Sequence, residues 1–497
     1  MSRSLYARLA RRYRGVPDAP TRRAFLQAAA ALGAGSLLSV CSGPRIKRRR
    51  PKPGHRVVVI GAGFAGLACA YELASVGVDV HVIEARKRLG GRVLGADDLV
   101  PGKRVEAGGE LIGSNHPLWS TYARRFGLEL EDVSAGEDLA TTVLLDGERL
   151  SEPETHELFL ELEAAYAQMT LLALAIDADE PWKSPRASEF DVLSNARWIA
   201  DLDTSTTCKR ALAAVFTADN GVATARQSLL GQLAMVKGGG LARYWTESEV
   251  YRCAQGNASL AAALADGIGS DRVHLGRPVV LVRSRERSAI VITVDGGAWE
   301  ADEVVLAVAP SVWKRIRFEP ALPEGIAPQL GLAVKYVAAV DAPYWRAGGL
   351  AAESIGDGEV SLTWDATEGQ PGDARAALVA FSGGPPAEAC RARSGELQQQ
   401  AYAHELETLL PGFRAHVTET RMYDWPADPW TACGYSFPAP GEVTKLAPLL
   451  RRGIGRVRFS GEHVSSKFPG YMEGALDSGA EVARRIVAGE RTEIART

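Results

Sequence analysis

The sequence contains few of the features that mark zinc-binding, disulfide-rich or membrane-spanning chains. Only six of its 497 residues are cysteines, and no two of them form a Cys-x-x-Cys pair. They are Cys41, Cys69, Cys208, Cys253, Cys390 and Cys433. This scatter predicts neither a zinc site nor a disulfide framework. No uninterrupted apolar run of membrane-spanning length follows residue 55, which excludes a multi-span membrane protein.

The chain also lacks an excess of charge of one sign. Its 57 Lys and Arg residues nearly balance 60 Asp and Glu residues, giving a formal net charge of −3. Such a balance gives no electrostatic reason to expect nucleic-acid binding. Hydrophobic residues at 46% and charged residues at 24% are ordinary for a globular protein, and the length suffices for several domains of about 100–200 residues.

Residues 1–53 have the composition of a leader and a linker. The first 40 residues hold seven arginines and one acidic residue, and the pair Arg22-Arg23 precedes Phe25-Leu26 and an uncharged, Ala-rich stretch. This order resembles a twin-arginine export signal, with a basic amphipathic helix as the alternative. We therefore expect residues 1–53 to take no part in the fold, and the protein to be periplasmic or at the outer surface.

A lipid anchor is a further alternative near the end of this leader. Leu38-Ser39-Val40-Cys41 resembles a lipoprotein cleavage box, although Val40 is bulkier than the small residue that usually precedes the cysteine. The basic run over 45–52 predicts a solvated linker that could also touch anionic lipid.

The first segment expected to fold has the pattern of a dinucleotide-binding unit. A β-branched run over 56–60 predicts a buried strand, and Gly61-Ala62-Gly63-Phe64-Ala65-Gly66 follows it. Helical spacing over 67–76 and a second strand over 79–83 complete the unit, which ends at Glu84. The motif thus lies between a strand and a helix, with an acidic residue 23 positions after Gly61, as dinucleotide binding requires.

Each part of this motif has a physical role. Gly61 permits the tight turn, Gly63 lets the backbone approach a pyrophosphate, and Gly66 lets the helix pack close to the strand. The N-terminus of the helix offers free N–H groups to the phosphates. Glu84 can accept hydrogen bonds from ribose hydroxyls.

Further segments resemble one family of FAD enzymes. They are Ala85–Val93 with its basic cluster and glycine pair, Val105–Gly113 with Gly108-Gly109, Gln255–Leu260, Arg272–Val280, Val304–Pro310, Arg317–Pro323, Phe459–His463 and Gly470–Ala475. Together they resemble the flavin monoamine oxidase superfamily, which includes monoamine, polyamine and L-amino-acid oxidases. The resemblance spans roughly residues 55–490. It is weak over 119–247, and Gln255 replaces a glycine of the family pattern.

The resemblance implies an α/β fold with two domains interleaved along the chain. A discontinuous Rossmann-like FAD-binding domain of the GR2 type would take residues 54–118, 248–325 and 441–497. A mixed α+β substrate domain of the monoamine oxidase kind would take the largely helical residues 119–247 and the sheet residues 326–440. The active site is expected between the two domains.

The resemblance also implies which residues contact FAD. Arg86 and Arg92 are expected near the pyrophosphate, Gly108-Gly109 along the flavin ring, Val279 at the adenine and the Met472 N–H at the flavin carbonyl edge. The full set is Gly61, Gly63, Phe64, Ala65, Gly66, Glu84, Ala85, Arg86, Gly91, Arg92, Gly108, Gly109, Glu110, Val279, Trp425, Gly461, Glu462, Gly470, Tyr471, Met472 and Ala475.

Four residues are expected to carry the chemistry. Lys335 lies in an apolar strand, where lysine is rare, and the family carries a lysine there that holds a water at flavin N5. The family has a tryptophan beside the flavin at the position of Trp425. Its aromatic cage, which holds an amine between two rings, falls on Tyr435 and Tyr471.

Departures from the family pattern narrow the chemistry. Some members attach flavin through a cysteine just before the first cage tyrosine, but Gly434 stands there and Cys433 is one residue early, so non-covalent FAD is expected. Leu111 and Ile112 occupy the region where amino-acid oxidases carry a carboxylate-binding arginine, which favours an amine without an α-carboxylate. Glu110 has two interpretations, a site for the distal ammonium of a diamine or a structural carboxylate.

The predicted function is therefore an exported FAD-dependent amine oxidase. It would oxidise an amine to an imine and pass the electrons to oxygen, which gives hydrogen peroxide; a homodimer is a further expectation left open. One alternative is an L-amino-acid oxidase whose carboxylate clamp comes from residues 119–247. Others are a dehydrogenase or desaturase that uses a periplasmic electron carrier, and a flavin-bound protein without catalysis.

Overall fold

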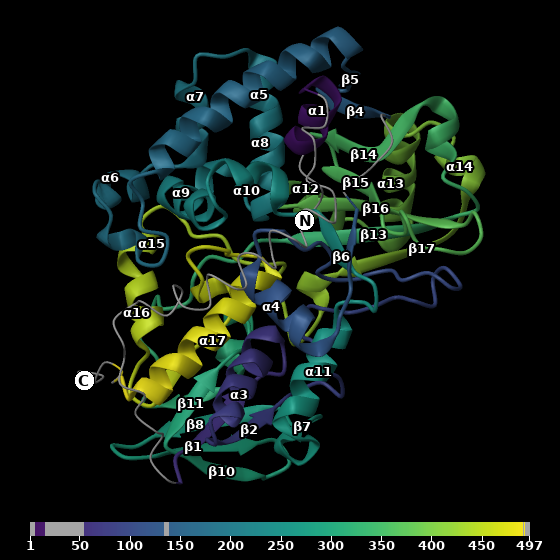
Figure 1. Cartoon of the computed structure of the whole chain (residues 1–497). Helices are drawn as coiled ribbons and strands as arrows, with labels where there is room; N and C mark the ends of the chain where they lie inside the picture. The colour runs from purple at the N-terminus through teal and green to yellow at the C-terminus, as the bar shows by residue number, and fades with distance from the viewer. Residues whose placement is uncertain (1–4, 15–53, 134–138, 491, 493–497) are drawn as a thin grey trace, which may run out of the picture.

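A computed structural model describes residues 5–14, 54–133, 139–490 and 492. The twin-arginine motif, Cys41 and the basic linker lie outside these residues, so the predictions of export and anchoring remain predictions. Figure 1 shows one part of the molecule built around β1 and α3, and another built from a group of helices that includes α5 and a sheet that includes β13.

The cofactor-binding part contains a five-stranded sheet in which every neighbouring pair is parallel. The strands, in spatial order, are β18 (Val457–Phe459), β11 (Glu303–Leu306), β1 (Arg56–Ile60), β2 (Asp79–Ile83) and β7 (Val273–His274). Segments from three distant regions of the chain therefore lie side by side (Figure 1). This confirms the predicted discontinuous Rossmann-like domain.

Apolar residues on both faces of this sheet explain its position between two layers. On β1, Val57 and Val59 belong to the core against the helices, and Val58 and Ile60 belong to the core on the opposite face. The helical layer contains α3 (Phe64–Ser75), α4 (Pro117–Phe126), α11 (Ala258–Ile268) and α17 (Met472–Ala488). The opposite layer is a four-stranded sheet of β10 (Ala298–Ala301), β9 (Ala289–Thr293), β8 (Val279–Ser284) and β12 (Arg317–Glu319).

The strand expected over 272–280 is two strands in different sheets. β7 pairs with β2, whereas β8 begins at Val279 and pairs with β9 and β12. Gly276 between them has φ +69°, a left-handed conformation that suits glycine and redirects the chain.

The substrate part combines a seven-stranded sheet with helices. In spatial order the strands are β17 (Val417–Asp424), β13 (Ala333–Val340), β16 (Ala376–Gly383), β15 (Leu362–Asp365), β14 (Leu350–Gly356), β4 (Ala140–Leu145) and β5 (Glu148–Arg149). The helices before the sheet residues are α5 (Glu152–Ala173), α6 (Ala187–Val192), α7 (Asn195–Asp201), α8 (Thr206–Asn220), α9 (Leu229–Gly238) and α10 (Ala242–Glu247). Between β16 and β17 lie α12 (Pro385–Arg391), α13 (Gly395–Leu409) and α14 (Phe413–His416), and after β17 come α15 (Glu442–Lys445) and α16 (Ala447–Arg452), whose Leu450 packs in the cofactor-side core.

Two features of residues 119–247 differ from the expected helical segment. Helix α4 crosses the proposed boundary at 118/119 and packs Trp119 and Tyr122 into the cofactor-side core. Strands β4 and β5 join the sheet of the substrate part, and β3 (Leu130–Asp132) pairs with β6 (Tyr251–Cys253). The helices at 157–174, 210–216 and 228–236 are present as α5, α8 and α9, with longer α5 and α8.

The expectation that residues 1–53 take no part in the fold is wrong for residues 5–14. They form helix α1 (Leu5–Arg14), whose Leu5, Tyr6 and Leu9 are buried in the core of the substrate part. Arg8 forms an ion pair with Glu353 of β14, and Arg12 Nε lies 2.8 Å from Glu152. The sequence-based expectation failed because arginines that suggest a leader here alternate with apolar residues on a packed face.

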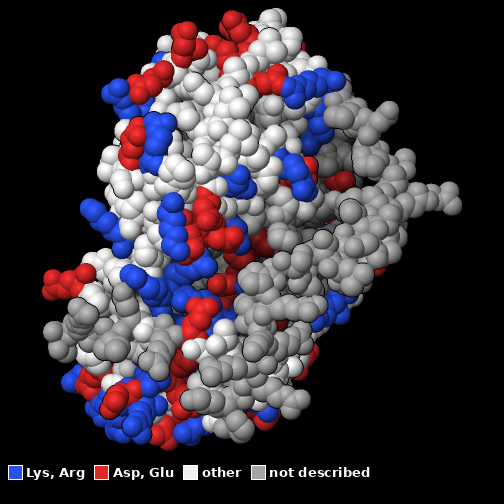
Figure 2. All heavy atoms as spheres, turned by 60° about the vertical axis from the view of Figure 1, so that its left-hand side comes forward, with Lys and Arg blue, Asp and Glu red and all other residues white. Residues whose placement is uncertain are grey.

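No helix in the described ranges is long and apolar enough to cross a membrane. On the face in Figure 2, basic and acidic side chains are interspersed, which agrees with the near-balanced charge of the sequence.

The docking of α1 predicts a stability effect. Because Leu9 is fully buried, Leu9→Ala is expected to weaken the packing of α1 against the substrate part by about 2–5 kcal/mol. The loss in free energy of unfolding is smaller if α1 detaches from the variant before the rest of the chain unfolds. Thermal unfolding of the full chain measures this. Leu171→Ala, at a position 67% exposed, is the matched control and should leave unfolding unchanged. Equal unfolding curves for the two variants would mean that α1 is not docked.

Candidate active site

One pocket lies where the carboxyl ends of β1, β2 and β11 face strand β13. Every predicted cofactor-binding and catalytic residue except Gly66 lines it. Ligands of open parallel sheets bind at this edge of the strands. The structure therefore brings together residues from five segments that are distant in sequence.

The geometry of the first motif agrees with its predicted roles. A Cβ on Gly66 would lie 2.0 Å from the Gly61 carbonyl oxygen, so only glycine allows α3 to pack this close to the turn. Gly66 thus acts from outside the pocket. Gly61 has φ +108° and donates its N–H to Ile83 O at 2.8 Å. Gly63 is the N-cap of α3, and no side chain caps the helix, whose first N–H groups remain available to a phosphate.

Glu84 is fixed at the end of β2 by the backbone. One carboxylate oxygen accepts the Ala62 N–H and the other accepts the Arg86 N–H, each at 2.7 Å. The carboxylate is buried and lines the pocket. Since each oxygen retains a lone pair, this position suits the acceptance of ribose hydroxyls.

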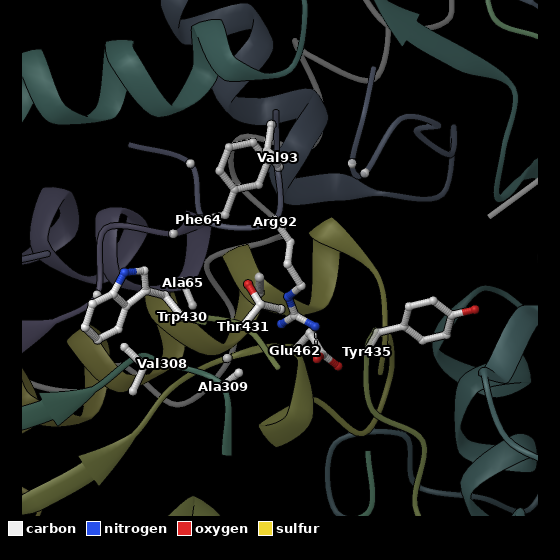
Figure 3. Close-up of a pocket in the computed structure, with 18 of the residues that line it drawn as sticks. Phe64, Ala65, Arg92, Val93, Val308, Ala309, Trp430, Thr431, Tyr435 and Glu462 are labelled. Atoms are coloured by element: carbon white, nitrogen blue, oxygen red, sulfur yellow. Dashed lines mark hydrogen bonds and ion pairs between the residues drawn. The ribbon is translucent and has the colours of Figure 1, made fainter. Parts of the chain in front are cut away.

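Both arginines expected near the pyrophosphate have acidic partners. Arg86 pairs with Asp428 and donates to Thr431 at 2.7 Å. Arg92 donates to Glu462 at 2.9 Å and to Gly434 O at 2.8 Å, in the middle of the pocket (Figure 3). Burial alone would lower the pKa of Arg92, but Glu462 outweighs it and the pKa rises. Contact of either arginine with a phosphate remains a prediction.

The structure adds pocket residues that the sequence analysis missed. Ala307, Val308 and Ala309 follow β11, and Trp430 and Arg315 lie near them, with the guanidinium 5.5 Å from the indole centroid. In Figure 3, Trp430 and Val308 lie on the side of the pocket opposite Tyr435. The run over 304–310 indicated a strand. Its pairing with β1, which brings its carboxyl end to the pocket, depends on the tertiary structure and could not be predicted from the run itself.

The glycine pair provides a bare backbone surface. A Cβ on Gly108 would lie 1.9 Å from Arg92 O and 3.1 Å from the Trp425 ring, and Trp425 Nε1 donates to Ala107 O at 3.1 Å. A Cβ on Gly109 would lie 3.2 Å from the Met472 side chain. Met472 is the first residue of α17, a second helix without a side-chain cap, so its N–H is also available. Two uncapped helix N-termini and a flat glycine backbone fit the pyrophosphate and the ring system of FAD.

The geometry at Gly434 agrees with non-covalent FAD. A Cβ on Gly434 would lie 2.8 Å from the Ala333 backbone nitrogen, so a cysteine does not fit there without a backbone shift. Cys433 is buried outside the pocket lining, and burial raises the pKa of its thiol. A thiol in that state is a poor nucleophile.

Lys335 is buried in β13 and lines the pocket. Its ammonium donates to Glu106 O and to Glu110 Oε2, each at 2.6 Å. Glu110 also accepts from Arg252 and Trp364, so both of its oxygens have partners within the chain. Of the two interpretations of Glu110, these contacts favour the structural carboxylate over a site for a substrate ammonium.

The two predicted cage tyrosines line the same pocket. Tyr435 donates its hydroxyl to Ala218 O at 2.6 Å, and Gly470, next to Tyr471, lies against the Tyr435 ring. Burial raises the pKa of both phenols, so they are neutral. His116, which the sequence analysis missed, packs edge-on against Tyr471 with centroids 5.4 Å apart, and burial lowers its pKa to about 3. A neutral imidazole adds no charge beside the cage.

A second cavity begins at Tyr471 and extends into the helices of the substrate part. The residues that line it include the carboxylates Asp219 and Glu249 and the polar side chains Asn220 and Gln232. Ala7 and Arg11 of α1 also line it. Tyr471 therefore lines both the cofactor pocket and a cavity whose charged lining residues are Asp219, Glu249 and Arg11.

Comparison with known proteins decides the family. The model of the flavin containing amine oxidoreductases matches residues 64–487. The chain belongs to this family. FAD is accordingly its cofactor, and the protein is a flavin-containing amine oxidase. A model of the pyridine nucleotide-disulphide oxidoreductases also matches residues 22–98, which include the G-x-G-x-x-G motif.

Several relatives of this amine oxidase have known activities. It is 28% identical to amine oxidase [flavin-containing] B of Homo sapiens, over 87% of this chain and 86% of that protein. It is also 28% identical to putrescine oxidase of Kocuria rosea (87% and 95%) and 25% identical to an L-amino acid dehydrogenase of Synechocystis (86% and 94%). Among solved structures, putrescine oxidase with bound putrescine and cyclohexylamine oxidase from Brevibacterium oxydans each superpose with TM-score 0.78 at 26% identity, covering 88% of this chain and 99% of theirs.

Gly63 offers a direct test of the cofactor site. A Cβ there would have no protein atom closer than 3.9 Å, so Gly63→Ala should fold normally and place its methyl group where the pyrophosphate is expected. We expect FAD affinity to fall at least tenfold, measured by FAD titration of the cofactor-free protein. Gly395→Ala, in open space at the start of α13, is the control and should bind FAD normally. Unchanged FAD affinity in Gly63→Ala would place the pyrophosphate elsewhere.

Proposed function

We propose that this amine oxidase acts on an amine without an α-carboxylate and passes the electrons to oxygen, with hydrogen peroxide as a product. Bound FAD supplies the acceptor, flavin N5, for hydride from the α-carbon of the amine. The resulting imine hydrolyses to an aldehyde or ketone and ammonia or a smaller amine. The observation that carries the substrate class is the charge of the cavity beside Tyr471.

The cavity charge favours a cationic substrate over an amino acid. Asp219 and Glu249 line it, and no arginine of residues 119–247 does so in the described part of the chain. Leu111 lines the cofactor pocket and Ile112 is fully buried, and neither can pair with a carboxylate. An α-carboxylate would therefore meet two acidic side chains and, among the described lining residues, one basic side chain, Arg11 of α1, so the arrangement is repulsive overall.

The chain's own residues would prepare the amine. The neutral rings of Tyr435 and Tyr471 hold the nitrogen without a counter-ion, so the desolvated amine loses its proton more readily than in water. The neutral form has the lone pair that becomes the C=N bond. Lys335 places positive charge beside the flavin, where negative charge develops.

A second candidate function is oxidation of an L-amino acid with a different electron acceptor. The relative in Synechocystis, named as an L-amino acid dehydrogenase, favours it, and Arg11 of α1 lies in the same cavity as the two carboxylates. This candidate would require Arg11 to bind the α-carboxylate.

Anaerobic bleaching of the flavin absorbance tests both candidates. The holoenzyme is mixed separately with a primary monoamine, a diamine, a polyamine, a cyclic secondary amine and an L-amino acid. We expect bleaching by an amine and not by the amino acid, and peroxide when oxygen is admitted. Lys335→Met should keep its FAD and bleach at least tenfold more slowly. Bleaching by the amino acid alone would overturn the proposed substrate class, and bleaching without peroxide would overturn the proposed acceptor.

We also propose export through the twin-arginine pathway, supported by Arg22-Arg23 and the apolar stretch that follows. Export with cleavage after residue 14 would remove α1 and widen the cavity beside Tyr471. The proposal also includes a homodimer and a lipid anchor at Cys41. The mass of the purified protein in solution tests the dimer, and metabolic labelling with a fatty acid tests the anchor. Replacing both arginines by lysine should retain the protein in the cytoplasm, measured by cell fractionation. Periplasmic protein from that variant would contradict the pathway.

A further inference from the structure

Three oxygen atoms surround the ammonium of Lys335. Its Nζ lies 2.6 Å from Glu106 O, 2.6 Å from Glu110 Oε2 and 3.4 Å from Gly108 O. An ammonium group has three N–H donors. Lys335 is 4% exposed, and its Nζ lies 5.3 Å from the centroid of the Trp364 ring. The site is therefore built for a charged lysine, and it faces the flavin pocket.

Glu110 is the carboxylate that balances this charge. Its other oxygen accepts from Arg252 Nε at 2.8 Å, and Trp364 Nε1 donates to Oε2 at 3.0 Å. Burial alone would raise the pKa of Glu110, but Lys335 and Arg252 outweigh burial and lower it to about 2. One carboxylate thus stands between two buried cations, and the three side chains together carry one net positive charge.

Burial shifts the other titratable groups around Lys335 toward their uncharged forms. Burial raises the pKa of Glu106 to about 8 and also raises the pKa of Asp365, whose backbone oxygen accepts from Arg252. Tyr423 of β17 and Phe381 of β16 lie opposite Lys335 in the sheet, and burial raises the pKa of the Tyr423 phenol. Burial thus shifts each of these acidic groups toward its uncharged form, and the pKa of Glu106, about 8, keeps that carboxyl mostly protonated at pH 6.5.

We propose that Glu110 is a positioning residue that holds Lys335 as an ammonium, so that the Lys335–Glu110–Arg252 triad presents one fixed positive charge to the flavin. This inference rests on the proposed function for the role of Lys335. A fixed charge there favours the negative charge that the bound cofactor gains on reduction, and it does so independently of pH. Glu110 belongs to the cofactor-side segment and Lys335 to the substrate sheet, so the contact also fixes the position of Lys335 in the pocket lining.

The test measures the midpoint potential of bound FAD against pH in the full-length holoenzyme. Reduction by dithionite needs no amine, so a wrong substrate class would not affect the result. Because burial raises the pKa of Glu106 to about 8, within the range of the experiment, Glu106→Gln serves as the reference. The double variant Glu106→Gln/Glu110→Gln is compared with it from pH 5.5 to 9.5. At acid pH the double variant carries one more positive charge and should have the higher potential.

As pH rises, Lys335 without its carboxylate partner should lose its proton. The midpoint potential of the double variant should then no longer exceed that of Glu106→Gln. We expect the difference in potential between the two variants to fall by at least about 30 mV, which corresponds to a tenfold change in the equilibrium constant of a two-electron couple. Adding Lys335→Met should abolish the change, which assigns it to the lysine. A difference that stays constant over the range would show that Glu110 has only a structural role and would overturn the proposal.

A second variant keeps the test independent of the folding of the Glu110 variants. Arg252→Met leaves the Lys335–Glu110 pair intact and removes the net charge. At pH 6.5 its potential should lie below that of the unmodified protein by at least a tenfold change in the equilibrium constant, with no new ionisation. Glu106→Gln replaces a carboxyl that is already protonated at that pH and should leave the potential unchanged. A potential unchanged by Arg252→Met would also overturn the proposal.

Discussion

The contact between Lys335 and Glu110 joins the two parts of the molecule at the place where they must act together. Lys335 belongs to β13 of the substrate sheet, and Glu110 follows the glycine pair on the cofactor side. Both side chains are buried. Removing one partner of a buried pair leaves an uncompensated charge, at a cost of about 3–5 kcal/mol, whereas separating exposed charges costs little. The pair therefore fixes the position of the substrate sheet against the cofactor pocket.

The shape of that pocket depends on glycines, which have no Cβ atom. At Gly66, Gly108 and Gly434 a Cβ would overlap neighbouring backbone, so these glycines allow segments to approach closely. At Gly63 a Cβ would meet no protein atom within 3.9 Å, so this glycine keeps space free for a ligand. The same motifs therefore contain glycines required for close backbone packing and a glycine that leaves space for a ligand. Their high glycine content reflects these two requirements rather than a need for flexibility.

Much of the cofactor site could be predicted from the sequence because its determinants are local. A strand, a glycine turn and a helix N-terminus occupy consecutive positions from Arg56 to Ser75, and their geometry follows from that order. Lys335 was recognisable because a lysine within an apolar strand has few explanations. The carboxylate partner of Lys335 was not recognisable, since Glu110 lies 225 positions away, and Arg252, which pairs with Glu110, is also distant in sequence.

The failures have the same cause. The split of residues 272–280 into β7 and β8 depends on which strands they pair with, and the strand order of the sheet is not encoded in any one segment. The arginines of helix α1 led to its assignment to a leader. The role of its apolar face follows from packing against α5, which the local sequence does not reveal. In both places the local pattern allowed two structures, and distant contacts selected one.

The arrangement of charge relates the cofactor pocket to the adjacent cavity. Arg86 and Arg92 are neutralised by Asp428 and Glu462, whereas the triad of Lys335, Glu110 and Arg252 retains a positive charge. The cavity on the other side of Tyr471 has acidic walls. Under the proposed function, Asp219 and Glu249 would attract an ammonium ion into this cavity, and the positive charge of the triad would repel it from the cofactor pocket. Between the two lie neutral phenol rings, which stabilise an uncharged amine as well as a cation, so the field favours loss of the ammonium proton as the substrate approaches the flavin.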